Sequence, residues 1–186
     1  MTSRIKVGII SASDRSSKGE REDKSGLLLK FLVEDFAAEV IVYKILPDDE
    51  ELLKKELCSM SDELGCDLIL TTGGTGLSPK DHTPDATREV IEKEVPGISE
   101  AIRQASLITT QLAMLSRAIS GIRGRSLIIN LPGSPEAVRD AFKVIKPILQ
   151  HAVSLLKGTV HDCQETRQQE WKRHTHTSSS LSCLHS

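Results

Sequence analysis

The sequence lacks two features that mark proteins of membranes and of nucleic acids. No apolar run approaches the roughly 18 residues that span a bilayer, and the apolar stretch 7–10 is too short for a signal-peptide core. Lysine and arginine total 24 against 26 aspartate and glutamate, a formal net charge of −2, which leaves no positive field for a polynucleotide or an anionic lipid surface. We therefore expect a cytoplasmic protein that binds neither nucleic acid nor membrane.

Cysteine is also scarce, and its spacing excludes two common roles. The four cysteines form no C-x-x-C pair and stand apart from histidine, so the pattern excludes a zinc site. A disulfide between Cys58 and Cys66 conflicts with the helix predicted over 50–64. We expect reduced thiols.

The length and composition fit one domain with a substantial core. The chain has 186 residues, of which 38% are hydrophobic and 27% charged, as in ordinary globular proteins. From Thr159 onward the hydrophobic pattern ends and the sequence becomes rich in serine and histidine. We expect a domain over residues 1–158 and a disordered tail over 159–186. Because His174 and His176 lack further ligands, a solvated tail is favoured over a metal site there.

Short apolar segments alternate with helical patterns along the domain. Five segments have the character of strands: 5–10, 39–46, 68–70, 118–122 and 126–131. Five have the apolar spacing of helices: 25–36 with Ser25 as its cap, 50–64, 85–94, 98–107 and 135–155, with a kink or break at Pro147. The alternation predicts an α/β fold with a mostly parallel sheet, to which the hairpin 118–131 adds one antiparallel strand.

The stretch Leu68-Ile69-Leu70-Thr71-Thr72-Gly73-Gly74-Thr75-Gly76 joins a buried strand to a glycine-rich loop. Closely spaced glycines let backbone N–H groups approach a bulky anion, and the threonines add hydroxyl donors, so the loop is typical of a phosphate-binding site. It matches neither G-x-x-x-x-G-K-[ST] nor G-x-G-x-x-G, because Pro79 and Lys80 stand at the wrong positions. A glycine-rich turn without a ligand is the alternative.

Four polar loops follow predicted strands: 11–14, 47–49, 71–81 and 130–135. In a parallel sheet the first three lie at one edge, where ligands of open α/β sheets bind. They bring together Asp14, Asp48 and Asp81, whose oxygen ligands suit Mg²⁺ held jointly with substrate phosphates. Asp48 as a helix cap and Asp14 as a turn residue are the structural alternatives. No G-x-S-x-G motif appears, and His82 is expected at the surface, so acyl transfer is disfavoured.

Several motifs together resemble the molybdenum-cofactor biosynthesis family, specifically its MogA-type molybdopterin adenylyltransferases and the G domain of gephyrin. These motifs are Ser11-Ala12-Ser13-Asp14-Arg15, Asp23-Lys24-Ser25-Gly26, Pro47-Asp48, Thr71 to Gly76 with Asp81, Thr83-Pro84-Asp85-Ala86-Thr87, Ala113-Met114-Leu115-Ser116-Arg117 and Asn130-Leu131-Pro132-Gly133. The similarity covers residues 5 to about 158.

The resemblance implies a three-layer α/β sandwich, a homotrimer, and Mg²⁺-dependent transfer of AMP from ATP to molybdopterin with release of pyrophosphate. It implies that Asp48 and Asp81 are catalytic and hold the metal, and that Ser116 contacts the pterin. The residues expected to bind substrate are Ser11, Ser13, Asp14, Thr72, Gly73, Gly74, Thr75, Gly76, Ser116, Asn130, Pro132, Gly133 and Ser134.

Three alternatives share the resemblance. One is the sister branch MoaB, one is the related domain of competence-damage proteins, and one is a non-catalytic pterin carrier or scaffold. Both aspartates and Ser116 are present, which favours an enzyme. Other proteins of molybdenum cofactor synthesis are further expected partners.

Overall fold

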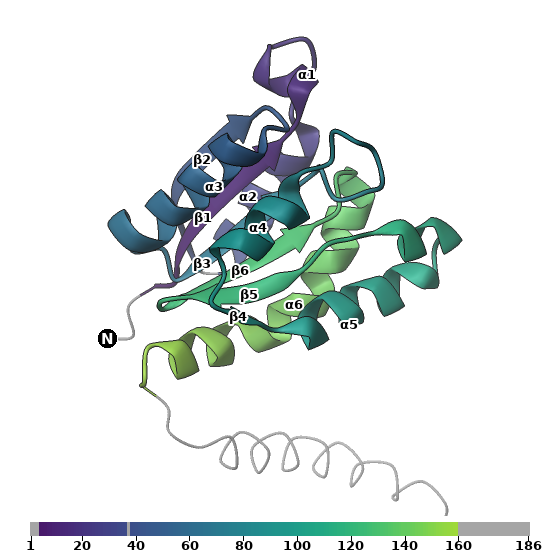
Figure 1. Cartoon of the computed structure of the whole chain (residues 1–186). Coiled ribbons are helices and arrows are strands. Elements are labelled where there is room, and N and C mark those ends of the chain that lie inside the picture. Colours follow the sequence, from purple (N-terminus) through teal and green to yellow (C-terminus); the bar gives the residue numbers. More distant parts are fainter. Residues whose placement is uncertain (1–3, 37, 160–186) are drawn as a thin grey trace, which may run out of the picture.

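A helix–sheet–helix sandwich forms the protein in the computed structural model, which describes residues 4–36 and 38–159 (Figure 1). The sheet separates two hydrophobic clusters. On one side Ile9, Leu70 and Ile129 pack with α2 (Lys24–Asp35), α5 (Pro96–Leu107) and α6 (Pro135–Leu156). On the other side the neighbouring residues of the same strands pack with α3 (Glu50–Cys58) and α4 (Thr83–Val90). Both faces of the sheet are covered, which explains the continuous apolar runs of its strands.

The sheet has the order β2-β1-β3-β6-β5-β4. Its strands are β1 (Lys6–Ala12), β2 (Glu39–Leu46), β3 (Leu68–Thr72), β4 (Lys93–Glu94), β5 (Ser120–Arg123) and β6 (Ser126–Leu131). The pairs among β2, β1, β3 and β6 are parallel, whereas β5 runs antiparallel to both of its neighbours. The predicted α/β sandwich with one antiparallel strand is therefore confirmed.

Several element boundaries differ from the sequence predictions. The helix predicted over 85–94 is α4, which begins at Thr83, and residues 93–94 form the unpredicted strand β4. The helix predicted over 50–64 is α3 followed by a π-helical segment, η1 (Ser59–Glu63). Of the kink or break predicted at Pro147, the break is wrong, because α6 continues through that residue. Two further short elements were not predicted: α1 (Asp14–Ser17) and the 3-10 segment η2 (Gln111–Leu115).

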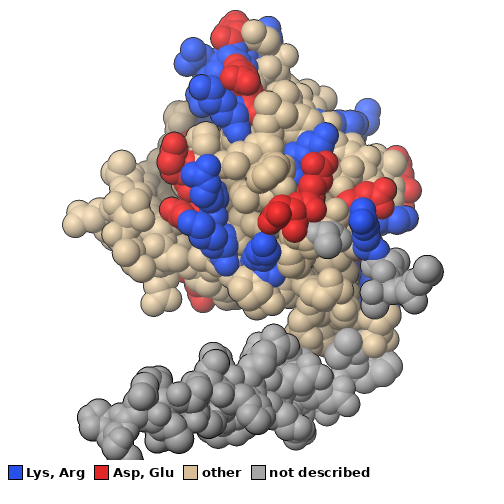
Figure 2. Space-filling model, turned by 180° about the vertical axis from the view of Figure 1, so that it is seen from behind, with Lys and Arg blue, Asp and Glu red and all other residues tan. Residues whose placement is uncertain are grey.

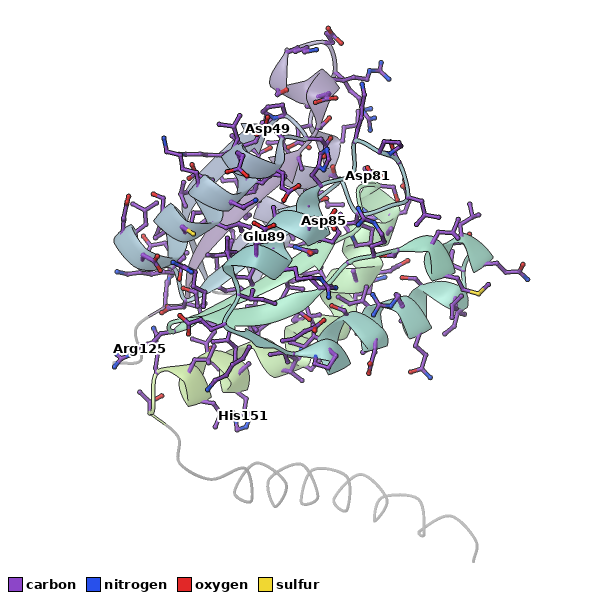
Figure 3. All side chains as sticks on the ribbon, viewed as in Figure 1. Asp49, Asp81, Asp85, Glu89, Arg125 and His151 are labelled. Atoms are coloured by element: carbon purple, nitrogen blue, oxygen red, sulfur yellow. The ribbon has the colours of Figure 1, made fainter. Side chains whose placement is uncertain are left out.

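The three polar loops 11–14, 47–49 and 71–81 lie at one edge of the sheet, as predicted, and the loop 130–135 joins them there. In the parallel registers Ser11 pairs with Thr72 and Thr72 with Leu131, so these strands end together. In Figure 3 Asp49 and Asp81 lie at this edge, near α1, whereas Arg125 and His151 lie toward the opposite end. The fold thus brings together residues far apart in sequence.

The surface carries no large field of one sign on the face opposite to that of Figure 1. Figure 2 shows lysine and arginine interspersed with aspartate and glutamate there. Among residues 4–36 and 38–159, no helix is long and apolar enough to cross a bilayer.

Two cysteines fall within the described residues, and both are free thiols. Cys66 is buried, and burial raises the pKa of its thiol to about 11. Cys163, Cys183, His174 and His176 lie outside the described residues, as does the predicted tail beyond Thr159.

Helix α2 is capped by Asp23 and not by Ser25, so the predicted cap was wrong by two positions. The buried Asp23 carboxylate accepts hydrogen bonds from the Gly26 N–H at 3.0 Å, the Ser25 hydroxyl at 3.2 Å and the Tyr43 hydroxyl. One side chain thereby joins the start of α2 to β2.

Replacing Asp23 by alanine is expected to lower the free energy of unfolding by about 2–4 kcal/mol, because it removes a cap and leaves the partly buried Tyr43 hydroxyl without its acceptor. Ser25→Ala is expected to cost about 1 kcal/mol or less. Denaturant unfolding of both variants measures the difference. Equal losses would contradict the assignment of the cap to Asp23.

Candidate active site

The glycine loop lies against the end of β1. Gly73 and Gly74 have φ angles of 92° and 60°, a region that favours glycine. A Cβ atom on Gly73 would lie 2.3 Å from the carbonyl oxygen of Ala12 and would therefore clash with it. On the other side, a Cβ on Gly133 would come within 3.2 Å of the Gly73 Cα. The chain can take this path at Gly73 only because that residue has no side chain.

Asp14, Asp48 and Asp81 gather beside this loop. The backbone N–H of Asp48 donates to Asp14 Oδ1 at 3.1 Å, and the Ser78 N–H donates to Asp81 Oδ2 at 2.9 Å. A Cβ on Gly74 would lie 2.3 Å from Asp48 Oδ1, and one on Gly76 would lie 2.9 Å from Asp81 Oδ2. The glycines thus leave room for both carboxylates, which come from different strand ends.

The electrostatics at Asp48 indicate an uncompensated charge. Burial, followed by the negative charges of Asp14 and Asp81, raises the pKa of Asp48 to about 6. Among the described residues, its Oδ1 atom and the hydroxyl oxygen of Thr83 are buried without a hydrogen-bond partner. Both oxygens lie beside Gly74, since a Cβ there would be 2.3 Å and 2.6 Å from them. Buried polar atoms of this kind fit a bound cation.

The carboxylates of Asp48 and Asp81 suit Mg²⁺ only if a bound ligand supplies further oxygen atoms to the metal. The part of the chain that the structure describes contains no group of three or more His, Cys, Asp or Glu side chains arranged to hold a metal. Mg²⁺ is commonly bound by one or two carboxylates, with water and phosphate oxygens completing its octahedron. Asp48 and Asp81 fit that partial role.

Two basic side chains lie next to the acidic cluster. Lys80 Nζ is 3.8 Å from Asp14 Oδ2, with 79% of its side chain exposed. His82 Nδ1 is 3.8 Å from a carboxylate oxygen of Glu50, and the residue is half-buried. The expectation that His82 lies at the surface therefore holds only in part.

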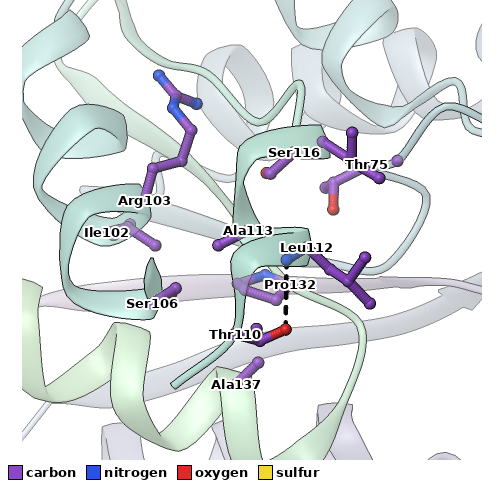
Figure 4. A pocket seen from close by; sticks show the side chains of 12 residues that line it. Thr75, Ile102, Arg103, Ser106, Thr110, Leu112, Ala113, Ser116, Pro132 and Ala137 are labelled. Atoms are coloured by element: carbon purple, nitrogen blue, oxygen red, sulfur yellow. Dashed lines mark hydrogen bonds between the residues drawn. The ribbon is translucent and has the colours of Figure 1, made fainter. Parts of the chain in front are cut away.

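A largely apolar pocket of about 250 Å³ lies next to the glycine loop (Figure 4). Its lining residues come from the loop, α5, η2 and the start of α6: Thr75, Gly76, Ile102, Arg103, Ser106, Thr110, Leu112, Ala113, Leu115, Ser116, Pro132 and Ala137. Figure 4 shows Thr75 across the pocket from Arg103, Ile102 and Ser106 of α5. Thr75 and Gly76 belong both to this wall and to the loop beside the carboxylates, so the two parts of the site share one loop.

Of the predicted binding residues, Thr75, Gly76, Ser116 and Pro132 line the pocket. Ser13 and Ser134 cap helices: their hydroxyls accept hydrogen bonds from the backbone N–H groups of residues 16 and 137. The exposed residue Gly133 lies against Gly73.

Ser11, Thr72 and Asn130 are buried, with exposed fractions of 2%, 1% and 0%. The Thr72 hydroxyl donates to the carbonyl of Pro132 at 2.6 Å. The amide of Asn130 donates to the hydroxyls of Thr71 and Thr87 at 3.0 Å and 2.8 Å and accepts from the N–H of residue 119 at 3.2 Å. The side chains of Thr72 and Asn130 thus hold the strand ends in place.

Three site residues were not among the predicted ones. Arg103 lines the pocket, where its guanidinium donates to the carbonyl of Ala118 at 2.6 Å. Thr83 and Arg117 stood within motifs that carried the family resemblance, which was the available signal for them. No pattern distinguished Arg103 from other polar residues of its helix.

Comparison with known proteins agrees with this geometry. The profile of a family described as "probable molybdopterin binding domain" matches residues 8–151. This chain belongs to the molybdopterin-binding family. The match includes the glycine loop, all three aspartates and Ser116.

Individual members of the molybdopterin-binding family are similar to most of this chain. Molybdopterin adenylyltransferase of Helicobacter pylori strain J99 is 40% identical over 170 residues, 90% of this chain and 97% of that protein. The molybdenum cofactor synthesis protein cinnamon of Drosophila melanogaster is 41% identical over 163 residues, 87% of this chain but 27% of cinnamon. The structure of the molybdopterin biosynthesis enzyme MoaB of Thermus thermophilus has a TM-score of 0.78 and 45% identity, covering 83% of this chain and 97% of that one.

The raised pKa of Asp48 predicts how stability depends on pH. Because the folded state holds the proton more tightly than the unfolded chain, ionised Asp48 destabilises the fold above about pH 6, and this cost fades as the pH falls toward 4. Asp48→Asn is expected to raise Tm by roughly 2–4 °C at pH 7.5 and to have a smaller effect at pH 4.5.

Thermal unfolding of wild type, Asp48→Asn and Asp49→Asn at both pH values measures this effect. Asp49 is exposed and its carboxylate caps α3. Asp49→Asn is therefore the control, and it is not expected to raise Tm at pH 7.5. A lower Tm for Asp48→Asn at pH 7.5 would show that the ionised carboxylate is stabilising, contrary to this assignment.

Proposed function

We propose that the protein is a molybdopterin adenylyltransferase, which transfers AMP from ATP to the terminal phosphate of molybdopterin and releases pyrophosphate. The observation that carries this proposal is the shared glycine loop, with an apolar pocket on one side and two carboxylates on the other. A substrate with an aromatic ring system and a phosphate needs an apolar wall joined to an anion-binding backbone. The similarity to an adenylyltransferase over 90% of the chain supports the same reaction.

The pterin end of the substrate fits the pocket. Its side chains are mostly apolar or carry hydroxyl groups, among them Ser116, Ser106 and Thr110. Pockets of this kind hold flat ligands by apolar contact and orient them by a few hydrogen bonds. We assign Ser116 to the pterin, as the family resemblance implies.

The nucleotide end fits the other side of the loop. The backbone N–H groups of residues 73–76 would bind phosphate oxygens, and Asp48 and Asp81 would hold Mg²⁺ on the triphosphate. Bound Mg²⁺ supplies charge neutralisation at the pyrophosphate leaving group. An oxygen of the molybdopterin phosphate attacks the α-phosphorus of ATP, and the bond from that phosphorus to the pyrophosphate oxygen breaks. The chain positions both reactants and needs no nucleophile of its own.

A MoaB-like protein or a pterin carrier is the second candidate, favoured by the 45% identity to the Thermus MoaB structure. A carrier binds molybdopterin without consuming ATP. Incubation with molybdopterin, ATP and Mg²⁺, followed by measurement of pyrophosphate and adenylyl-molybdopterin, separates the two candidates.

We further propose that the chain assembles as a homotrimer in the cytoplasm. Exposed apolar side chains at the end of α5 and in η2 support association: Leu107, Ile108, Leu112, Met114 and Leu115. Ile108 is 89% exposed, which is unusual for an isoleucine without a partner. A mass in solution equal to three chains supports the trimer, and a monomeric mass contradicts it.

Asp48→Asn and Asp81→Asn are expected to lower kcat by at least about 100-fold, because each removes a carboxylate from the metal and nucleotide. Asn keeps the shape of the side chain, so molybdopterin binding is expected to change by less than threefold. Pyrophosphate release and fluorescence titration measure these two quantities.

Asp49→Asn is the matched control, since asparagine also caps helices and Asp49 is adjacent in sequence. It is expected to retain wild-type turnover. Wild-type activity in either Asp48→Asn or Asp81→Asn would refute the catalytic assignment of that residue.

A further inference from the structure

Arg117 connects the pocket to the loop that carries Asp81. It directly follows Ser116, and its backbone N–H donates to the carbonyl of Thr75 at 2.9 Å. Its guanidinium donates to the carbonyl of Gly76 at 2.8 Å through Nε and to the carbonyl of Asp81 through Nη2. One side chain therefore holds both ends of the loop Gly76–Asp81.

The same guanidinium is fixed by Asp85 in the first turn of α4. Its Nη1 and Nη2 atoms donate to the two carboxylate oxygens of Asp85 at 2.8 Å and 2.9 Å. The planar fork of arginine permits this two-bond contact together with the bonds to the carbonyls, which a lysine ammonium cannot reproduce. The pKa of Asp85 is lowered by this contact.

The loop has few other attachments. Residues 77–80 are exposed, and their backbone hydrogen bonds within the described chain stay inside the loop: Ser78 N–H to Asp81 Oδ2, Lys80 N–H to Ser78 Oγ and Asp81 N–H to the Ser78 carbonyl. Segments with exposed backbone bonds and few buried contacts open easily. The exposed Lys80 also forms an ion pair with Asp14 at 3.8 Å, but only Arg117 among the described side chains donates hydrogen bonds to both ends of the loop.

We infer that Arg117 is a positioning residue, which sets Asp81 relative to Asp48 and to the pocket by holding the loop Gly76–Asp81 closed. The effect of Arg117 on turnover rests on the proposed function. The effect of Arg117 on the loop does not.

The chain offers a matched control in the pair of Arg123 and Asp62. Arg123 also contacts both oxygens of one aspartate, at 2.6–3.1 Å, and a backbone carbonyl, that of Val90, at 3.0 Å. The exposed fractions of the side chains are similar, 36% and 42% for Arg117 and Asp85 against 26% and 46% for Arg123 and Asp62. Arg123 is the last residue of β5 and pairs with Ser126, the first residue of β6. It therefore lies at the end of the strands opposite to the glycine loop.

The experiment compares Arg117→Lys with Arg123→Lys in the adenylylation assay. Arg117→Lys is expected to lower kcat about 10- to 100-fold and to raise the Mg²⁺ concentration needed for half-maximal rate, because Asp81 is misplaced. The KM for molybdopterin is expected to change by less than threefold. Both variants are expected to lower Tm by similar amounts. Arg123→Lys is expected to leave these kinetic parameters unchanged. Equal kcat in the two variants overturns the inference.

Hydrogen exchange of the backbone amides of residues 76–78, 80 and 81 provides a test independent of turnover. Arg117→Lys is expected to speed exchange of these amides at least tenfold relative to Arg123→Lys, and Asp85→Asn is expected to act in the same direction. Unchanged exchange overturns the inference, including in the case that Arg117→Lys does not fold and only Asp85→Asn is measured. An inactive wild type with faster loop exchange in the variants would contradict the proposed function and support the positioning role.

Discussion

The site depends on the close approach of the glycine loop to the ends of its neighbouring strands. Gly73 lies where any side chain would collide with the carbonyl of Ala12, and Gly74 and Gly76 lie where side chains would displace the carboxylates of Asp48 and Asp81. Parallel strands that end in register make this approach possible, because they bring three separate loops to one edge. Backbone amides, carboxylates and the pocket wall are thereby held within one small region.

This arrangement places negative charge where water is partly excluded. The fold leaves Asp48 with a raised pKa and an oxygen without a hydrogen-bond partner among the described residues. Such a group costs stability in the free protein, and a bound cation relieves that cost. The destabilisation is thus consistent with a site built for a ligand, since unfavourable local electrostatics commonly mark functional positions.

The layers, the mostly parallel sheet and the convergence of the loops followed from apolar spacing and from where strands end. Short-range details were harder to predict. Asp23 caps α2 because Tyr43, from a different strand, shares its carboxylate, and no local pattern shows that contact. Asn130 was expected to bind substrate, and no local pattern showed that its amide donates to two buried threonine hydroxyls. Arg117 reaches a loop that precedes it by many residues, so its contacts required the three-dimensional arrangement.

A crystal structure with molybdopterin, Mg²⁺ and a non-hydrolysable ATP analogue tests the central claim most directly. The account predicts phosphate oxygens on the amides of residues 73–76, the metal between these oxygens and the carboxylates of Asp48 and Asp81, and the pterin beside Ser116. A nucleotide bound away from the glycine loop, or a pterin outside the pocket between α5 and η2, would contradict it.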